Sequence, residues 1–154
     1  MWDKKHPGTP ILHKDTFTRG KGRFNDLLYT PSEELPDDSY PLCLTTGRRL
    51  YHYNNGSMSL RNPEIYSISS EEFVEIHPGE AEILGVKTGD NVRVISRRGS
   101  LEVKAHVTTK SRPGSIFMSF HFPETPTTVL TGPGEDLLAL TPEYKVCAVR
   151  VEKI

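Results

Sequence analysis

The chain has 154 residues, with 19 lysines and arginines against 20 aspartates and glutamates and a formal net charge of -1 at pH 7. This length fits one domain with a sizeable core, and the balanced charge excludes a global field that would attract nucleic acid or an anionic membrane. No apolar run has membrane-spanning length, and residues 1–6 lead into no apolar signal region. We therefore expect a cytoplasmic protein with no nucleic-acid or membrane partner.

Residues 1–40 are predicted to form an irregular lead-in or linker, because they show no sustained periodicity and contain four prolines and three glycines. Residues 41–154 are predicted to form the folded domain. Short apolar runs bounded by turn residues predict strands at 42–46, 91–96, 101–107, 116–120 and 144–151. In the run 101–107, apolar residues alternate with Glu102, Lys104 and His106, which predicts one buried and one wetter face.

Two helices are expected between these strands. Residues 78–84 begin with a proline, carry glutamates early and precede Gly85, a pattern typical of a capped helix. A weaker pattern predicts a second helix over 69–74, and residues 97–100 are predicted to form a hairpin turn with solvated arginines. Short strands, many turns and small helices favour a closed or nearly closed β barrel, since closure removes unpaired strand edges.

The two cysteines, Cys43 and Cys147, lie in separate apolar runs with no second cysteine or histidine at metal-binding spacing. We interpret them as buried free thiols, while a disulfide between neighbouring strands stays open at this stage. The chain has no Cys-x-x-Cys pair to carry an iron–sulfur cluster. The sequence thus predicts no metal site.

The segment LTTGRRLYHYNNGSM at 44–58 has the character of an anion-binding loop. Gly47 lets backbone N–H groups approach a ligand closely, and Arg48 and Arg49 can fork onto phosphate oxygens. No nucleophile in the segment is paired with a base. The loop therefore indicates the binding of a polar ligand rather than catalysis, and we predict no catalytic residue in this chain.

Three motifs together resemble one family: the segment at 44–58, GDNVRVISRRG at 89–99 and PEYKVCAVRVE at 142–152. They are similar to the C-terminal molybdopterin-dinucleotide-binding domain of molybdenum or tungsten oxidoreductases. The lead-in HPGTPILHKDTFTRGKGR at 6–23 and the run IFMSFHF at 116–122 resemble, within that group, the catalytic subunit of formate dehydrogenases. Nitrate reductases share the domain's pattern, so the resemblance leaves nitrate as the alternative substrate.

The resemblance implies a mainly β fold, a double-psi β barrel with one or two short helices, that binds molybdopterin guanine dinucleotide. Its metal would be ligated outside this chain, and its partners would be upstream domains of the same subunit and electron-transfer subunits. A non-enzymatic double-psi binding module is a further alternative. Carried over to this sequence, the family's cofactor-binding positions are Thr46, Gly47, Arg48, Arg49, Leu50, His52, Asn54, Asn55, Phe120, Thr128 and Lys145. Thr128 departs from the family, which usually has asparagine there.

Overall fold

The structure, a computed structural model, describes residues 11, 13, 15–136 and 139–154. The first part of the motif at 6–23 therefore lies outside the described residues. The chain divides into two units, residues 1–31 and residues 32–154. In the described part of the first unit, the residues are irregular apart from a bridge between Phe17 and Gly20. The second unit contains residues 32–40, which the sequence analysis placed in the lead-in.

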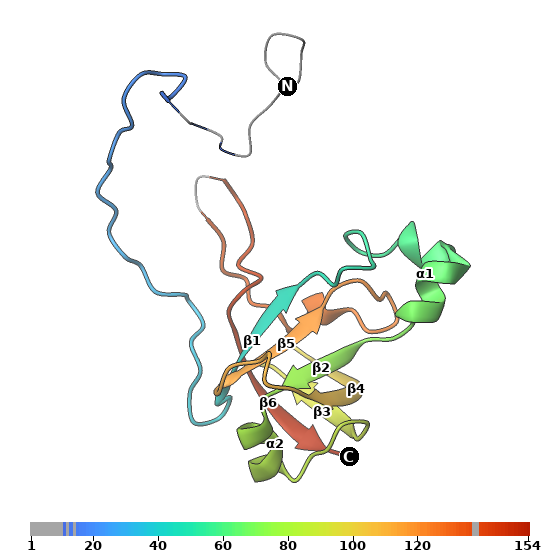
Figure 1. The fold of residues 1–154 in the computed structure, drawn as a ribbon. Coiled ribbons are helices and arrows are strands. Elements are labelled where there is room, and N and C mark those ends of the chain that lie inside the picture. Colours follow the sequence, from blue (N-terminus) through green and yellow to red (C-terminus); the bar gives the residue numbers. More distant parts are fainter. Residues whose placement is uncertain (1–10, 12, 14, 137–138) are drawn as a thin grey trace. The chain divides into compact units, whose positions relative to one another are not determined.

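The second unit is a closed barrel of six strands in the order β1-β5-β2-β4-β3-β6 (Figure 1). The strands are β1 (Leu42–Gly47), β2 (Phe73–Ile76), β3 (Asn91–Ile95), β4 (Ser100–Val107), β5 (Ser115–Ser119) and β6 (Cys147–Lys153). The pairs β1–β5 and β2–β4 are parallel, and the other four are antiparallel. Exchanging β1 with β4, β2 with β5 and β3 with β6 reproduces the same pairs of neighbouring strands. The barrel therefore consists of two topologically equivalent halves, β1–β3 and β4–β6. This topology is the predicted double-psi β barrel.

Strand alternation fills the barrel with aliphatic side chains. In β1, Leu42 and Leu44 are buried while their neighbours are partly exposed, and in β4 the buried residues are Val103 and Ala105. Such alternation gives each strand one face toward the core. Burial of apolar surface on that face stabilises the fold by about 25 cal/mol per Å². The predicted two-faced strand at 101–107 is therefore confirmed.

Both cysteines are free, although their strands are neighbours. The β1–β6 register pairs Leu44 with Cys147 and Cys43 with Ala148. The Cys147 side chain belongs to the core, whereas Cys43 points to the other face and is partly exposed. Because side chains on adjacent positions of paired strands point to opposite faces, the disulfide left open above does not form.

Two α-helices accompany the barrel, and one was predicted correctly. Helix α2 spans Pro78–Leu84 and ends at Gly85, whose φ of 63° is left-handed. The Val86 N–H then donates to the Ala81 carbonyl at 2.8 Å, which completes the expected C-terminal cap. The His77 side chain caps the other end by accepting from the Gly79 N–H at 3.1 Å.

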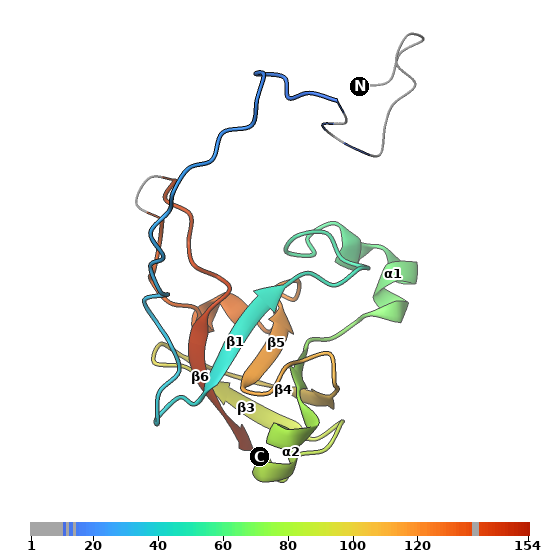
Figure 2. The same ribbon diagram turned by 60° about the vertical axis from the view of Figure 1, so that its left-hand side comes forward.

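The helix predicted over 69–74 is wrong, because β2 begins at Phe73 and the second helix, α1, lies earlier, at Pro63–Ile68. Asn62 caps α1 by accepting from the N–H groups of Glu64 and Ile65, and Pro63 occupies its first turn. This Asn-Pro pair is a helix-start signal that our sequence analysis overlooked. In Figure 2, α1 and α2 lie toward opposite ends of the barrel.

Two short 3₁₀ helices, η1 (Ser59–Arg61) and η2 (Thr127–Leu130), lie in the connections that follow β1 and β5. Strand β6 begins three residues later than predicted. Just before it, the Tyr144 carbonyl accepts from the Thr46 Oγ1 at 2.6 Å. Among the described residues, no helix has the length and apolar character needed to cross a membrane.

The predicted hairpin turn joins β3 to β4, with the Ser96 N–H donating to the Gly99 carbonyl at 2.9 Å. Its arginines are not merely solvated, which corrects the expectation. Arg97 forms ion pairs with Glu34, at 2.8 Å, and with Asp37, while Arg98 reaches the other Glu34 oxygen at 2.7 Å. These contacts tie part of the segment 32–40 to the barrel.

Candidate functional site

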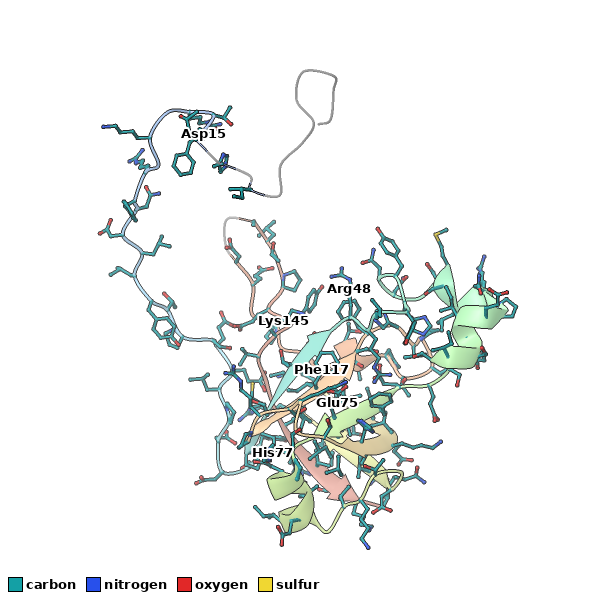
Figure 3. The ribbon with its side chains drawn as sticks, viewed as in Figure 1. Asp15, Arg48, Glu75, His77, Phe117 and Lys145 are labelled. Carbon is teal, nitrogen blue, oxygen red and sulfur yellow. The ribbon has the colours of Figure 1, made fainter. Side chains whose placement is uncertain are left out.

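The candidate site lies where the parallel strands β1 and β5 end. Their register pairs Gly47, the last residue of β1, with Ser119, the last residue of β5. Parallel strands that end in register release their following residues at the same edge, so Arg48 and Phe120 leave the barrel side by side. Figure 3 labels Arg48 and Lys145 near this end of the barrel, and His77 near the end that carries α2.

Two cations contact the Phe120 ring. The Arg48 guanidinium carbon lies 5.3 Å from the ring centroid, and the Lys145 Nζ lies 5.9 Å from it. Both distances are in the range of cation–π attraction. Lys145 reaches this position although it lies in the loop before β6, because its Nζ donates to the Thr46 carbonyl and the Thr46 Oγ1 donates to the Tyr144 carbonyl at 2.6 Å.

Arg48 is further oriented by Asn54. Its Nε and Nη2 donate to the Asn54 Oδ1 at 3.1 and 2.7 Å. Asn54 itself has a φ of 48°, a left-handed conformation that asparagine tolerates better than most residues. Arg48 and Lys145 are both exposed, so each places a positive charge at the surface beside an aromatic face.

A cavity of about 520 Å³ adjoins this cluster. Three of the predicted residues line it, namely Asn55, Phe120 and Thr128, and they come from the loop after β1, from the end of β5 and from η2. Ser57 and Arg61 add a hydroxyl and a guanidinium to the lining, and Leu60, Phe122 and Pro126 supply apolar contacts. The sequence analysis did not include Ser57 and Arg61, although both follow closely on the predicted loop.

The side chains of Arg49 and His52 do not line this cavity. The Arg49 Nη2 donates to Glu72 at 2.6 Å and to the Phe73 carbonyl at 2.9 Å, and its guanidinium carbon lies 3.4 Å from the Phe73 ring centroid. The His52 ring is buried between Ser59 Oγ at 3.0 Å and the Ser69 carbonyl at 2.7 Å. Their contacts with a cofactor stay a prediction, and the contacts present here stabilise the loop from inside.

Gly47 and Leu50 also place no side-chain donor at the site: Gly47 serves packing, and Leu50 is exposed. A Cβ on Gly47 would lie 2.6 Å from the Phe117 ring, so glycine is needed there for packing against β5. Leu50 is 91% exposed, which leaves its side chain without a packing partner on the barrel. Figure 3 shows Phe117 on the barrel below the Arg48 end.

Glu72 is a structural residue of this site that the sequence analysis missed. Its carboxylate is buried and accepts from Arg49, from the Phe73 N–H at 3.1 Å, and from both the N–H and the Oγ of Ser119. Burial raises the pKa of Glu72 above its usual value, and Arg49 and these hydrogen bonds oppose that rise. A signal existed, since Val74 and Ile76 point inward and a period of two extends to position 72.

The described residues contain no group of three or more histidine, cysteine, aspartate or glutamate side chains that would hold a metal ion. The site is instead defined by two surface cations, an aromatic ring, amides and hydroxyls beside a cavity. Such a donor set suits a polar, anionic ligand with a flat ring system. The fold and site therefore define a ligand-binding β barrel.

Residues 42–148 match the family model described as "Molydopterin dinucleotide binding domain". The chain belongs to this family. It is 47% identical over 150 residues to "F420-dependent formate dehydrogenase 2 subunit alpha" of Methanococcus maripaludis, covering 96% of this chain and 22% of the relative. It is 45% identical over 154 residues to "F420-dependent formate dehydrogenase subunit alpha" of Methanocaldococcus jannaschii, covering 99% of this chain and 23% of that protein.

The chain thus spans less than a quarter of the length of these curated relatives. Among solved structures, it is similar to acetylene hydratase from Pelobacter acetylenicus with a TM-score of 0.64 and 18% identity, over 75% of this chain and 18% of that one. At this identity the likeness shows the fold alone. The family and its cofactor class, a molybdopterin dinucleotide, are in agreement with the resemblance noted from the sequence.

Proposed function

We propose that this chain holds the guanine dinucleotide form of a molybdopterin cofactor, carrying molybdenum or tungsten, in an enzyme that oxidises formate to carbon dioxide. The observation that supports the proposal is the convergence of Arg48, Phe120 and Lys145 beside the cavity at the end of β1 and β5. The names of the relatives favour formate over nitrate and an enzyme over a non-enzymatic module. In this proposal the chain binds and orients the cofactor.

The residues present fit such a group. Arg48 and Lys145 supply charge-assisted donors for the diphosphate, and the Phe120 ring offers a flat apolar face for a purine or pterin ring. Asn55 and Thr128 supply neutral hydrogen-bonding groups at the cavity wall. When bound, the cofactor's metal supplies the two-electron chemistry, whereas this chain's residues fix its position and electrostatic surroundings.

The partners belong to the same proposal. Because the relatives are more than four times as long as the aligned region, we propose that further domains of one catalytic subunit cover the cofactor from the other side. We also propose electron-transfer subunits as partners. The cytoplasmic location stays a prediction from the sequence.

The test is to replace both surface cations in the assembled enzyme, as Arg48→Ala with Lys145→Ala. The metal and the guanine nucleotide bound per polypeptide are then measured, together with formate oxidation. Each lost bond to a charged group is expected to weaken binding about tenfold or more. A matched control is Arg93→Ala with Lys104→Ala, which removes two exposed cations from β3 and β4.

The control is expected to keep its cofactor, because Arg93 pairs with Glu102 on β4 and Lys104 with Glu71, whereas Arg48 and Lys145 contact Phe120 at the cavity. Wild-type cofactor content and activity in the Arg48 and Lys145 variant would contradict the proposal. Equal losses in both double variants would contradict it as well, since the effect would then follow from net charge alone.

A further inference from the structure

His121 connects the two ends of the loop that carries Arg48 and Asn54. Its ring is fully buried two residues after the end of β5. The Arg49 N–H donates to the His121 Nε2 at 2.7 Å, and the His121 Nδ1 hydrogen-bonds the Asn54 carbonyl. One imidazole thus bridges backbone groups that are five residues apart in the chain.

These two partners determine the tautomer of the ring. A backbone N–H can only donate, so Nε2 must be the acceptor, and a carbonyl can only accept, so Nδ1 must carry the hydrogen. A doubly protonated ring would direct an Nε2 hydrogen at the Arg49 N–H. The bridge therefore requires the neutral ring with its hydrogen on Nδ1.

The surroundings of the ring favour this neutral state. Burial lowers the pKa of His121, and the charges of His52, Arg49 and Arg48 lower it further, while the bond to the Asn54 carbonyl opposes the shift. The other rings facing it, Phe120 and Phe122, carry no charge. The Phe122 centroid lies 6.4 Å from it and the His52 centroid 5.3 Å.

The bridge acts directly on the candidate site. Asn54 is held by its carbonyl to His121 while its side chain orients Arg48, and Phe120 is the neighbour of His121 in the chain. The loop also packs tightly against the backbone of His121, because a Cβ on Gly56 would lie 2.4 Å from the His121 carbonyl oxygen. Without the bridge, Asn54 would lose the contact that fixes its left-handed backbone.

We propose that His121 is a positioning residue, a neutral imidazole that joins Arg49 to Asn54 and so holds Arg48 against Phe120 for an anionic cofactor. This role rests on the proposed function for its ligand, but the bridge itself does not. His121 acts through Arg48 and Asn54 and is not assigned a contact with the cofactor.

The first test is made on the full chain without cofactor. Nitrogen NMR of the histidine rings is expected to show a protonated Nδ1 and an unprotonated Nε2 for His121 at neutral pH. Hydrogen exchange at the Arg49 amide is expected to become about tenfold faster in His121→Phe, which keeps a ring but loses both bonds. The His121→Gln variant, which retains an acceptor, is expected to restore part of the protection.

The control is Val94→Ala, which removes buried volume from β3 and leaves the bridge intact. Strand β3 lies opposite β5 in the ring of strands. In Val94→Ala, hydrogen exchange at the Arg49 amide is expected to change only as much as the exchange that occurs through global unfolding. A hydrogen on Nε2, or an imidazolium at neutral pH, would overturn the proposal. The wild-type NMR measurement decides this even where a variant does not fold.

The second test uses the assembled enzyme and the cofactor it contains. His121→Phe is expected to lower the bound guanine nucleotide at least tenfold relative to Val94→Ala, and His121→Gln is expected to recover part of that loss. Wild-type loading in His121→Phe would overturn the positioning role, whatever Arg48→Ala shows. The outcome for Arg48→Ala with Lys145→Ala judges the proposed function separately.

Discussion

Replacing Glu72 with glutamine tests whether the loop is anchored from inside the barrel. The Glu72 side chain has no exposed area, and it pairs with an Arg49 side chain that is 11% exposed. Glu72→Gln keeps the size of the side chain but leaves the buried guanidinium without its paired charge. Removing one partner of a buried ion pair destabilises a protein by about 3–5 kcal/mol. Because the amide oxygen can still accept from Arg49, we expect a value near the lower end, about 3 kcal/mol.

The neighbouring glutamate provides a matched control. The Glu71 side chain is 59% exposed and pairs with Lys104, which is 51% exposed, at 2.9 Å. An exposed pair contributes less than about 1 kcal/mol, so Glu71→Gln is expected to have little effect. The two variants carry the same substitution one residue apart, and they differ in the burial of the ion pair.

Urea unfolding of the full chain measures both losses, with the slope of the transition checked for constancy. The reasoning would be refuted if the two variants lost stabilities that agree within about 0.5 kcal/mol. It would also be refuted if Glu72→Gln were as stable as the wild type. In either case Arg49 would not depend on Glu72 for its buried position.

Three further outcomes are expected from the same chain. The pKa of His121 is lowered in the folded state, so its contribution to the free energy of unfolding is fully present above about pH 6.5 and is lost as the pH falls toward the folded pKa. Urea titrations at pH 7.5 and 5 should show this loss in the wild type and not in His121→Phe. Gly47→Ala should lower stability in thermal melts by about 1–3 kcal/mol through the clash with Phe117, and Phe117→Leu should relieve it. Gly85→Ala meets no atom within 4 Å, so only its left-handed φ should lower stability, by about 1 kcal/mol.

Elements with strong local signals could be predicted from the sequence. Helix α2 has the predicted bounds because Pro78 suits a first turn and Gly85 adopts the left-handed cap. The alternation in β4 likewise predicts which side chains enter the core. The region 69–74 shows the limit of such reasoning, because Phe73 and Val74 belong to a strand that is stabilised by pairing with β4 and β5. Tertiary pairing overrides a weak helical pattern there.

The candidate site was predictable as a set of segments but not as a geometry. Arg48 and Arg49 are adjacent and chemically identical, and no local pattern shows that one contacts Phe120 while the other contacts Glu72. That difference depends on which residues β2 and β5 place beside the end of β1. Lys145 lies almost a hundred residues from Arg48, and only the resemblance to a family assigned it to the same site.

The strand ends explain why ligand binding and core stability are linked in this fold. At the end of β1, Arg48 points to the surface and Arg49 to Glu72, and at the end of β5, Phe120 lies between the inward Ser119 and His121. The inward positions change from even to odd numbers at these ends, because Leu42, Leu44 and Thr46 are the buried residues of β1, and Ile116 and Met118 precede Ser119 in β5. Beyond the strands, the side chains fall into an outer set that can meet a ligand and an inner set that holds the loop. Since Glu72 and His121 both hold Arg49, changes in the inner set should alter the position of Arg48 without touching it.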